Sequence, residues 1–296
     1  MKSNTRGTLE MSAAMVISGT IGWAVVRSAL PIVDLLFWRC VFGAATLLVV
    51  CAAMGMLRGT LSLRLIGIAA LGGVALVLNW VLIFAAFSRA SISIATAVYN
   101  TQPFMLVVLG ALFFSERLTT TKLMWLGVAF AGVLLIAQAR PDAGYGGTGY
   151  AAGVLMALGA AFLYALAAII TKKLSGAPPH LIALIQLCVG ILVFAPFATL
   201  SQLPSDAGAW IALVAMGVVY TGLVYVLLYG AIQKLPTHLT AALSFIFPIV
   251  AIGVDFLVFG HRLRPMQFVG AAAILVAAAG MNLGWSLPRS KTPVPQ

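Results

Sequence analysis

Residues 90–114 read ASISIATAVYNTQPFMLVVLGALFF, an apolar run of a length that crosses a bilayer. Four polar residues and a proline, YNTQP at 99–103, stand at its centre. A proline inside a helix removes a backbone hydrogen bond and clashes with the preceding turn. In lipid the freed groups need partners, so interrupted helices occur where they are buried in protein or line a cavity. The stretch therefore predicts a membrane-spanning helix that is broken beside a cavity.

The rest of the chain has the composition of a membrane protein. Of its 296 residues, 62% are hydrophobic and 8% are charged, against about 25% charged in soluble domains. The net charge of +11 is spread singly or in pairs over short loops, without a basic patch. Cys40, Cys51 and Cys188 fall within apolar segments and lack metal-ligand spacing. We therefore expect a lipid bilayer around the chain, and no nucleic acid, metal or cofactor.

Ten apolar segments predict an all-α integral membrane protein with ten transmembrane helices. Residues 9–26 lack a convincing small-residue cleavage site and are interpreted as the first span rather than as a signal peptide. The longest connection, 140–149, divides the chain near its midpoint. The predicted spans are 9–26, 33–56, 64–87, 91–114, 121–139, 149–170, 180–200, 208–231, 238–259 and 266–286.

The basic residues predict the orientation of these spans. Placing both termini in the cytoplasm puts eleven of the 17 Lys and Arg residues inside and five outside, with Arg39 within a span. Because Lys and Arg in short loops favour the cytoplasmic side, we expect a multi-pass protein of the inner (plasma) membrane with both termini cytoplasmic.

The two halves of the chain resemble each other. A shift of 145 residues lays 71–87 (LGGVALVLNWVLIFAAF) on 216–232 (MGVVYTGLVYVLLYGAI), and it brings Pro103 onto Pro248. Two halves of five spans insert in opposite senses because five is odd, and inverted repeats are typical of secondary transporters. We expect a first repeat at 1–140, a connecting loop at 141–149 and a second, inverted repeat at 150–296.

Pro103 and Pro248 predict one helix break in each half, at the midplane position where such transporters bind substrate. Thr96, Tyr99 and Asn100 share a helix face with Pro103 through their spacing of three, four and seven. Ser244 occupies the matching face of the second half, which is less polar. A plain kink, or polar groups that hold helices together, is the alternative interpretation.

Other polar and aromatic residues lie too deep in their spans to be interfacial anchors. Candidate cavity residues of this kind are Trp23, Asn79, Trp80, Tyr164 and Tyr225. Arg39 and Asp255 are the clearest charges within spans, at similar predicted depths, and such charges are costly unless paired or facing water. They are either a buried ion pair or, for Asp255, a proton carrier.

Once these motifs are placed, the chain resembles the EamA-type branch of the drug/metabolite transporter superfamily. The resemblance rests on residues 103–136, on Arg39 in FWRCVFGAATLLVV, and on the turn Ser115-Glu116-Arg117-Leu118, which is similar to the family's Gly-Glu-Arg-Leu pattern. The second copy of the turn has His261 where Glu is common. Residues 15–23 (MVISGTIGW) lack the membrane carboxylate of the related small multidrug pumps.

The resemblance implies a transporter, and the aromatic residues resemble those of amino-acid exporters of the YddG type. The leading hypothesis is a secondary transporter that exports small metabolites, above all amino acids, by alternating access around a midplane cavity. Asn79, Thr96, Tyr99, Asn100 and Ser244 would bind the polar end of the solute. A single chain suffices for such a cavity, so a monomer is the simplest state.

Two alternatives belong to other classes. A multidrug or toxic-compound efflux pump of the same superfamily would use a carboxylate in an aromatic pocket, for which Asp255 is the candidate. A membrane-embedded enzyme would need clustered acids, histidines or a metal, and His180, His238 and His261 lie apart at loop edges. We expect no enzyme and no catalytic residues.

Overall fold

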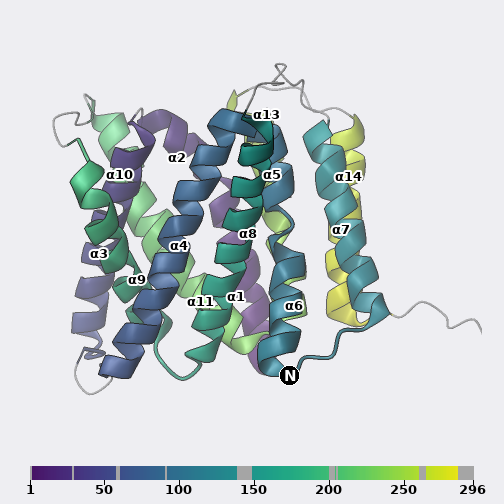
Figure 1. The fold of residues 1–296 in the computed structure, drawn as a ribbon, viewed down its shortest axis with the longest axis horizontal. Coiled ribbons are helices and arrows are strands. Elements are labelled where there is room, and N and C mark those ends of the chain that lie inside the picture. The colour runs from purple at the N-terminus through teal and green to yellow at the C-terminus, as the bar shows by residue number, and fades with distance from the viewer. Residues whose placement is uncertain are drawn as a thin grey trace, which may run out of the picture.

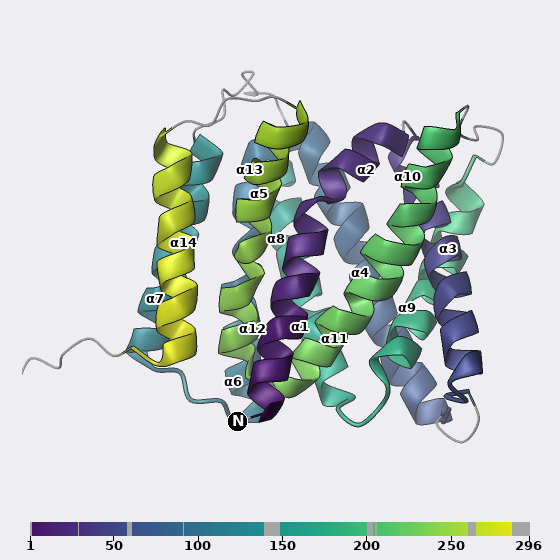
Figure 2. The same cartoon turned by 180° about the vertical axis from the view of Figure 1, so that it is seen from behind.

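In the computed structural model (Figure 1), the described residues form helices joined by short connections. The structure describes residues 2–28, 30–57, 61–90, 92–138, 149–199, 204, 206–259 and 265–285. Its helices stand roughly upright between two faces, as both side views show (Figures 1 and 2). The prediction of an all-helical membrane protein is confirmed.

The first half of the chain contains helices α1 to α7. Their bounds are α1 Lys2–Gly19, α2 Ile21–Ser28, α3 Ile32–Ala53, α4 Leu63–Ala90, α5 Ile92–Tyr99, α6 Gln102–Phe114 and α7 Thr120–Gln138. The second half contains α8 to α14. Their bounds are α8 Tyr150–Lys173, α9 Pro179–Phe194, α10 Ala207–Gly217, α11 Val224–Lys234, α12 Thr237–Ser244, α13 Ile246–Phe259 and α14 Pro265–Leu283, with a short 3₁₀ turn at Ala195–Phe197 and a π-helical segment at Val218–Leu223.

Each predicted span corresponds to one helix or to two consecutive ones. Seven described segments are long and apolar enough to cross a membrane, and three shorter apolar helices complete the set. Their outward side chains include Leu63, Leu112, Leu192 and Leu257, all more than 70% exposed. Large apolar side chains exposed to this degree suit hydrocarbon rather than water.

The fourth and ninth spans are broken, but the breaks precede the prolines rather than coincide with them. The fourth is interrupted at 100–101, and Pro103 is the second residue of α6. The ninth is interrupted at Phe245, and Pro248 is the third residue of α13. The prolines thus occupy the first turn of a new helix, where the missing N–H has no intrahelical partner to lose.

Two further interruptions have no proline and were not predicted. The first span bends at Thr20, whose hydroxyl donates to the carbonyl of Ile17 over 2.8 Å. In the eighth span the π-helical segment lies between α10 and α11. In it the hydroxyl of Thr221 donates to the carbonyl of Met216, five residues earlier, over 2.7 Å.

Small residues bring the central helices close together. On α8, Ala157, Ala160, Ala161 and Ala165 are fully buried, and α8 packs along α4. Helices α7 and α14 form a pair at one side of the molecule (Figure 1). A Cβ on Gly132 of α7 would lie 2.6 Å from the carbonyl oxygen of Gly270, so glycine is needed at this crossing.

The two faces of the molecule carry different connections. We call the face where α1 begins the N-terminal face; α6, α8 and α11 also end there (Figures 1 and 2). Helices α3, α8 and α10 begin at the opposite face. Helices α1 and α8, the first of each half, therefore run in opposite directions.

Candidate functional site

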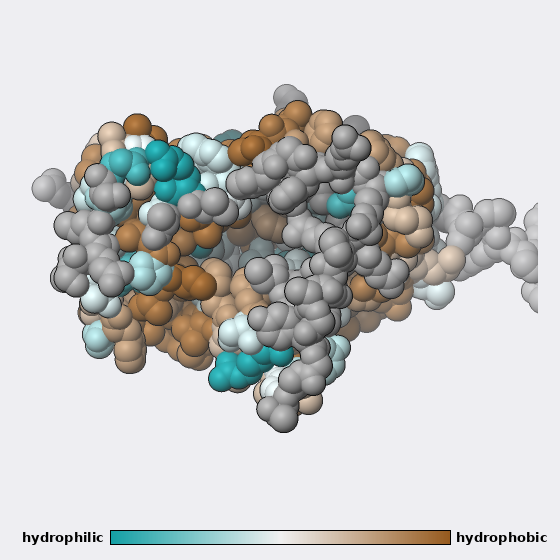
Figure 3. Space-filling view, turned by 90° about the horizontal axis from the view of Figure 1, so that it is seen from above, coloured by the Kyte–Doolittle hydropathy of each residue, from teal (hydrophilic) through white to brown (hydrophobic). Residues whose placement is uncertain are grey.

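A cavity of ≈ 230 Å³ lies between the halves of the chain. From the face opposite the N-terminus, the molecule is visibly hollowed at its centre (Figure 3). Eight of the sequence-predicted residues line this cavity. They are Arg39, Trp80, Thr96, Tyr99, Asn100, Tyr164, Tyr225 and Ser244.

The break between α5 and α6 supplies the polar wall. The side chain of Asn100 is buried, and its Nδ2 donates to the carbonyl of Thr96 over 2.7 Å. The hydroxyl of Thr101 donates to the carbonyl of Val98 over 2.8 Å. Both carbonyls also accept a backbone N–H, from Asn100 and Thr101 respectively, so these side chains add a second hydrogen bond to each carbonyl in the last turn of α5. Part of the polar block therefore holds the break together, as the alternative interpretation expects, while Asn100 still faces the cavity.

Asn79 does not line the cavity but lies behind Tyr99. Its Nδ2 donates to the Tyr99 hydroxyl over 3.2 Å and to the carbonyl of Ala160 over 2.7 Å. Asn79 is 1% exposed. The Tyr99 ring meets the Tyr164 ring edge to face, with centroids 6.3 Å apart. Asn79 thereby fixes Tyr99 against α8 and positions the hydroxyl at the cavity wall.

Aromatic side chains form the opposing wall. Trp80 on α4 and Tyr225 on α11 occupy equivalent places in the two halves, and they meet edge to face with centroids 6.3 Å apart. Tyr225 in turn packs edge to face on Tyr229 at 5.3 Å. The residues that a shift of 145 places in register are thus direct neighbours at the cavity.

Arg39 is the charged side chain of this wall. Its guanidinium carbon lies 4.5 Å from the centre of the Trp80 ring and 6.0 Å from that of Tyr225. Its Nε donates to the hydroxyl of Thr221 over 2.7 Å. Asp255 belongs to α13, but its side chain lies outside the described residues, so the predicted pair with Arg39 remains a prediction.

Three other predicted residues lie away from the main cavity. Trp23 on α2 is 38% exposed and does not line it. Pro103 borders a small adjoining cavity together with Gln102, Tyr164 and Ser244. Pro248 is buried near the start of α13. The tryptophan was predicted from its depth along the span, but the bend at Thr20 changes the course of the helix after it.

Sequence reasoning missed several lining residues. Gln102, a weaker candidate because helical spacing turns it away from the face of Tyr99, lines the cavity, and its Oε1 is buried and unpartnered among the described residues. Met15, Ser18 and Ile21 contribute from the first span at a regular spacing of three. Tyr220 lies in the π-helical segment, and its hydroxyl is 2.8 Å from that of Thr20. The spacing on the first span was a signal that could have been used.

Within the described residues, no group of three His, Cys, Asp or Glu could hold a metal ion.

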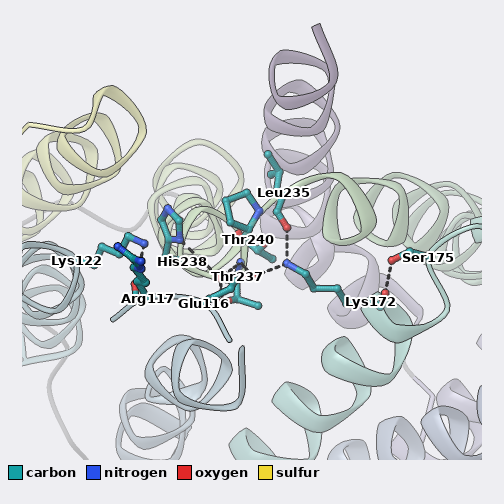
Figure 4. A network of polar contacts seen from close by, with 10 residues as sticks. Glu116, Arg117, Lys122, Lys172, Ser175, Leu235, Thr237, His238 and Thr240 are labelled. Carbon is teal, nitrogen blue, oxygen red and sulfur yellow. Dashed lines mark hydrogen bonds and ion pairs between the residues drawn. The ribbon is translucent and has the colours of Figure 1, made fainter. Parts of the chain in front are cut away.

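A second polar cluster, which we call the Glu116 network, lies at the N-terminal face (Figure 4). The Glu116 carboxylate accepts from the Thr237 backbone N–H (3.0 and 3.1 Å), from the Thr237 hydroxyl (2.6 Å) and from Lys172 Nζ (2.8 Å). His238 Nδ1 lies 3.8 Å away. The turn after α6 is thereby tied to the end of α8 and to the first residues of α12.

The Glu116 carboxylate is held in its charged form. Burial acts to raise the pKa of Glu116, but the contacts from His238, Lys172 and Thr237 outweigh it and keep the pKa well below its ordinary value. Ser115, just before it, has a left-handed backbone with φ 53°. In the family pattern that the turn resembles, glycine stands at this position.

A neighbouring ion pair strengthens the same face. Lys234 Nζ, at the end of α11, lies 2.5 Å from Glu10 Oε2 of α1 and also donates to the carbonyl of Gly230. Arg6 adds a 2.9 Å contact to the same carboxylate. Both clusters join the first half of the chain to the second.

Comparison with known proteins supplies the family. Two regions, residues 6–138 and 151–283, match the EamA-like transporter family. The uncharacterized transporter YxxF of Bacillus subtilis (strain 168) is 29% identical over 293 residues, covering 95% of this chain and 90% of that protein. A protein of Salmonella typhimurium named a probable amino-acid metabolite efflux pump is 27% identical over 195 residues, 62% of this chain and 64% of the pump. Its namesake in Escherichia coli (strain K12) is 28% identical over the same coverage. The chain thus spans under two thirds of these pumps.

A solved crystal structure has the same fold. It superposes with a TM-score of 0.82 at 20% identity, over 94% of this chain and 98% of the other. The two family matches, the apolar helices and the cavity between the halves all indicate a membrane transporter. The chain therefore belongs to the EamA-like transporter family, within the drug/metabolite transporter superfamily, and is a multi-pass membrane transporter rather than an enzyme.

Proposed function

We propose that this protein is a secondary transporter that exports small metabolites, above all amino acids, by alternating access. The observation that carries the proposal is the cavity of ≈ 230 Å³ between a polar wall at the α5–α6 break and an aromatic wall on α4 and α11. Such a cavity suits a small solute with one polar end and one apolar end. The names of the two enterobacterial relatives support amino-acid metabolites as the class.

The architecture we propose is a pair of inverted repeats, residues 1–140 and 150–296, joined by a loop at 141–149. The opposite courses of α1 and α8 and the two family matches support it. Rocking of one repeat against the other would expose the cavity to each side in turn. We further propose that the N-terminal face, with both termini, is cytoplasmic in the inner membrane and that one chain forms the working unit.

Drug efflux, the second candidate, gains no specific support. The cavity is small beside the about 300–1,000 Å³ of pockets for drug-sized ligands. Its charged lining residue is a cation, Arg39, whereas a pump for cationic drugs needs an anionic one. Among the described lining residues there is no carboxylate.

Uptake of a panel of radiolabelled amino acids into proteoliposomes, with and without a pH gradient, tests the proposal. We expect saturable uptake that falls at least about tenfold in Tyr99→Phe and Asn100→Ala, because each loses a polar group facing the solute. Tyr150→Phe is the matched control, since Tyr150 is exposed at the start of α8. Acceleration by the gradient that disappears in Asp255→Asn would add proton coupling. Transport of cationic dyes without any amino acid would contradict the proposal.

A further inference from the structure

Arg39 is a buried cation in the cavity wall of a membrane protein. It is 8% exposed and lies on α3, about two turns from the start of that helix. An ionised side chain within a membrane span is costly and generally pairs with another group or faces water. The group that balances the charge of Arg39 therefore bears on what the cavity binds.

Three elements fix the position of the guanidinium. Trp80 of α4 and Tyr225 of α11 take its π contacts, at 4.5 and 6.0 Å from the ring centres. The Thr221 hydroxyl of the π-helical segment accepts a hydrogen bond from Nε and donates one to the carbonyl of Met216. Because contacts from both halves of the chain hold it, the fork of terminal nitrogens has a defined direction.

Among the described side chains, which do not include that of Asp255, the positive charge is only partly compensated. A guanidinium has five N–H groups; the bond to Thr221 uses one of them, and Arg39 also makes a hydrogen-bonding contact with the Tyr225 side chain. No described carboxylate lies within 4 Å of Arg39, although ion pairs at that distance occur at Arg27, Lys172 and Lys234. Aromatic faces stabilise the cation but do not neutralise it. As far as the described side chains go, the other donors are available to a group in the cavity.

We infer that Arg39 binds the carboxylate of the transported solute. This deepens the proposed function and depends on it: the substrates are compact monocarboxylates whose apolar part lies among Trp80, Tyr164 and Tyr225. Arg–carboxylate pairs match in shape and are commonly bidentate. A phosphate is less suitable, because a dianion in this largely aromatic cavity would find one described cation.

The cavity treats the two charged ends of an amino acid differently. The carboxylate has a counter-charge in Arg39, whereas an ammonium group finds no described carboxylate in the lining and meets neutral acceptors such as Gln102 Oε1. A 2-oxo acid, which keeps the carboxylate and lacks the amine, should therefore bind about as well as the parent amino acid. An amide or amine, which lacks the carboxylate, should not.

Calorimetric titration of the purified full chain in detergent tests this with two series of probes. One contains leucine, 4-methyl-2-oxopentanoate, leucinamide and 3-methylbutylamine; the other contains phenylalanine, phenylpyruvate and phenylalaninamide. We expect the acids of at least one series to bind about 10- to 100-fold more tightly than its amide, the range of a hydrogen bond to a charged group. Equal binding of acid and amide overturns the inference and leaves the proposed function intact. Binding of no compound in either series overturns both.

Variants locate the effect. Arg39→Gln should lose the same 10- to 100-fold for the acids and little for the amides, and Arg39→Lys should keep part of the affinity through its charge. Arg89→Gln is the matched control, because Arg89 is exposed at the end of α4. If Arg39→Gln does not fold, Arg39→Lys and the probe series on the unaltered protein decide. Unchanged preference for acids in a folded Arg39→Gln protein would overturn the assignment.

Discussion

The two faces of this transporter are held together differently. At the N-terminal face the side chains of Glu116, Lys172 and Glu10 are each under a fifth exposed, and their ion pairs join the two halves of the chain. At the opposite face Arg27 and Asp206 also join the halves, over 3.0 Å, but both side chains are about half exposed. Exposed pairs contribute little to stability, whereas groups with several buried hydrogen bonds contribute more. The N-terminal face is therefore the more firmly held of the two, and under the proposed alternating access its contacts would have to break during transport.

The largest expected effect follows from Glu116→Gln. The variant keeps the size of the side chain but removes the charge that Lys172 and the N-terminus of α12 face. We expect a loss of about 2–4 kcal/mol, because one partner of a largely buried pair is left uncompensated. Thermal unfolding in detergent measures it. A melting temperature equal to that of the unaltered protein would show that the faces do not differ.

Acid should reproduce much of this effect without a mutation. The pKa of Glu116 is lower in the folded chain, so its contribution is complete above the unfolded pKa of about 4.3 and is lost as pH falls through the folded pKa. We expect thermal stability to fall as the pH drops below about 4. In Glu116→Gln that part of the pH dependence should be absent, and its persistence would assign the acid sensitivity to other carboxylates.

Lys234→Met should cause an intermediate loss. It removes the ion pair with Glu10 and the bond to the carbonyl of Gly230 but retains the apolar stem. The expected cost is about 1–2 kcal/mol, smaller because Lys234 is 27% exposed and Arg6 still contacts Glu10. The same melting assay applies, with Lys173→Met, an exposed lysine at the end of α8, as control.

Ser115→Gly should strengthen the N-terminal face. Ser115 has φ 53°, a left-handed conformation that glycine adopts without the steric cost to an L side chain. The gain is about 0.5–1 kcal/mol after the larger chain entropy of glycine is subtracted. Lower stability would show that the serine hydroxyl has a role that outweighs the strain.

Arg27→Gln should have the smallest effect. Its ion pair with Asp206 is exposed on both sides, and Asp206 keeps its other role of accepting from the Ala209 N–H at the start of α10. We expect no resolvable change in melting temperature. A loss comparable to that of Glu116→Gln would invalidate the contrast between the faces.

Much of the fold could be predicted because lipid imposes strong rules on sequence. Each of the ten predicted apolar runs corresponds to a helical segment, and seven of the described segments are long and apolar enough to cross a bilayer. The breaks were harder to locate. Pro103 and Pro248 mark the neighbourhood, but a proline is tolerated in a first turn, so the interruption falls just before each of them. The bend at Thr20 and the π-helical segment leave no comparable mark in the sequence.

The site was predictable where helical spacing alone decides which side chains face inward. Thr96, Tyr99 and Asn100 line the cavity as their spacing requires. Asn79 and Trp23 show the limit of that reasoning. Depth along a span indicates how far a residue lies from the surface, but not whether a neighbour covers it, as Tyr99 covers Asn79, or whether a bend turns it outward. Those outcomes depend on packing between distant segments.

The π-helical segment at Val218–Leu223 has a consequence for the phase of the eighth span. One residue more or less rotates all that follows by about 100°, because an α-helix has 3.6 residues per turn. The segment has a wider turn than the surrounding helix, and Tyr220 and Tyr225, five residues apart, both reach the cavity. Its counterpart α4 is an unbroken helix from Leu63 to Ala90. Residues of α4 and of the eighth span that align in sequence therefore point in different directions around their helix axes. If the two halves are repeats, as proposed, a cavity between them can in this way present unlike walls to an asymmetric solute.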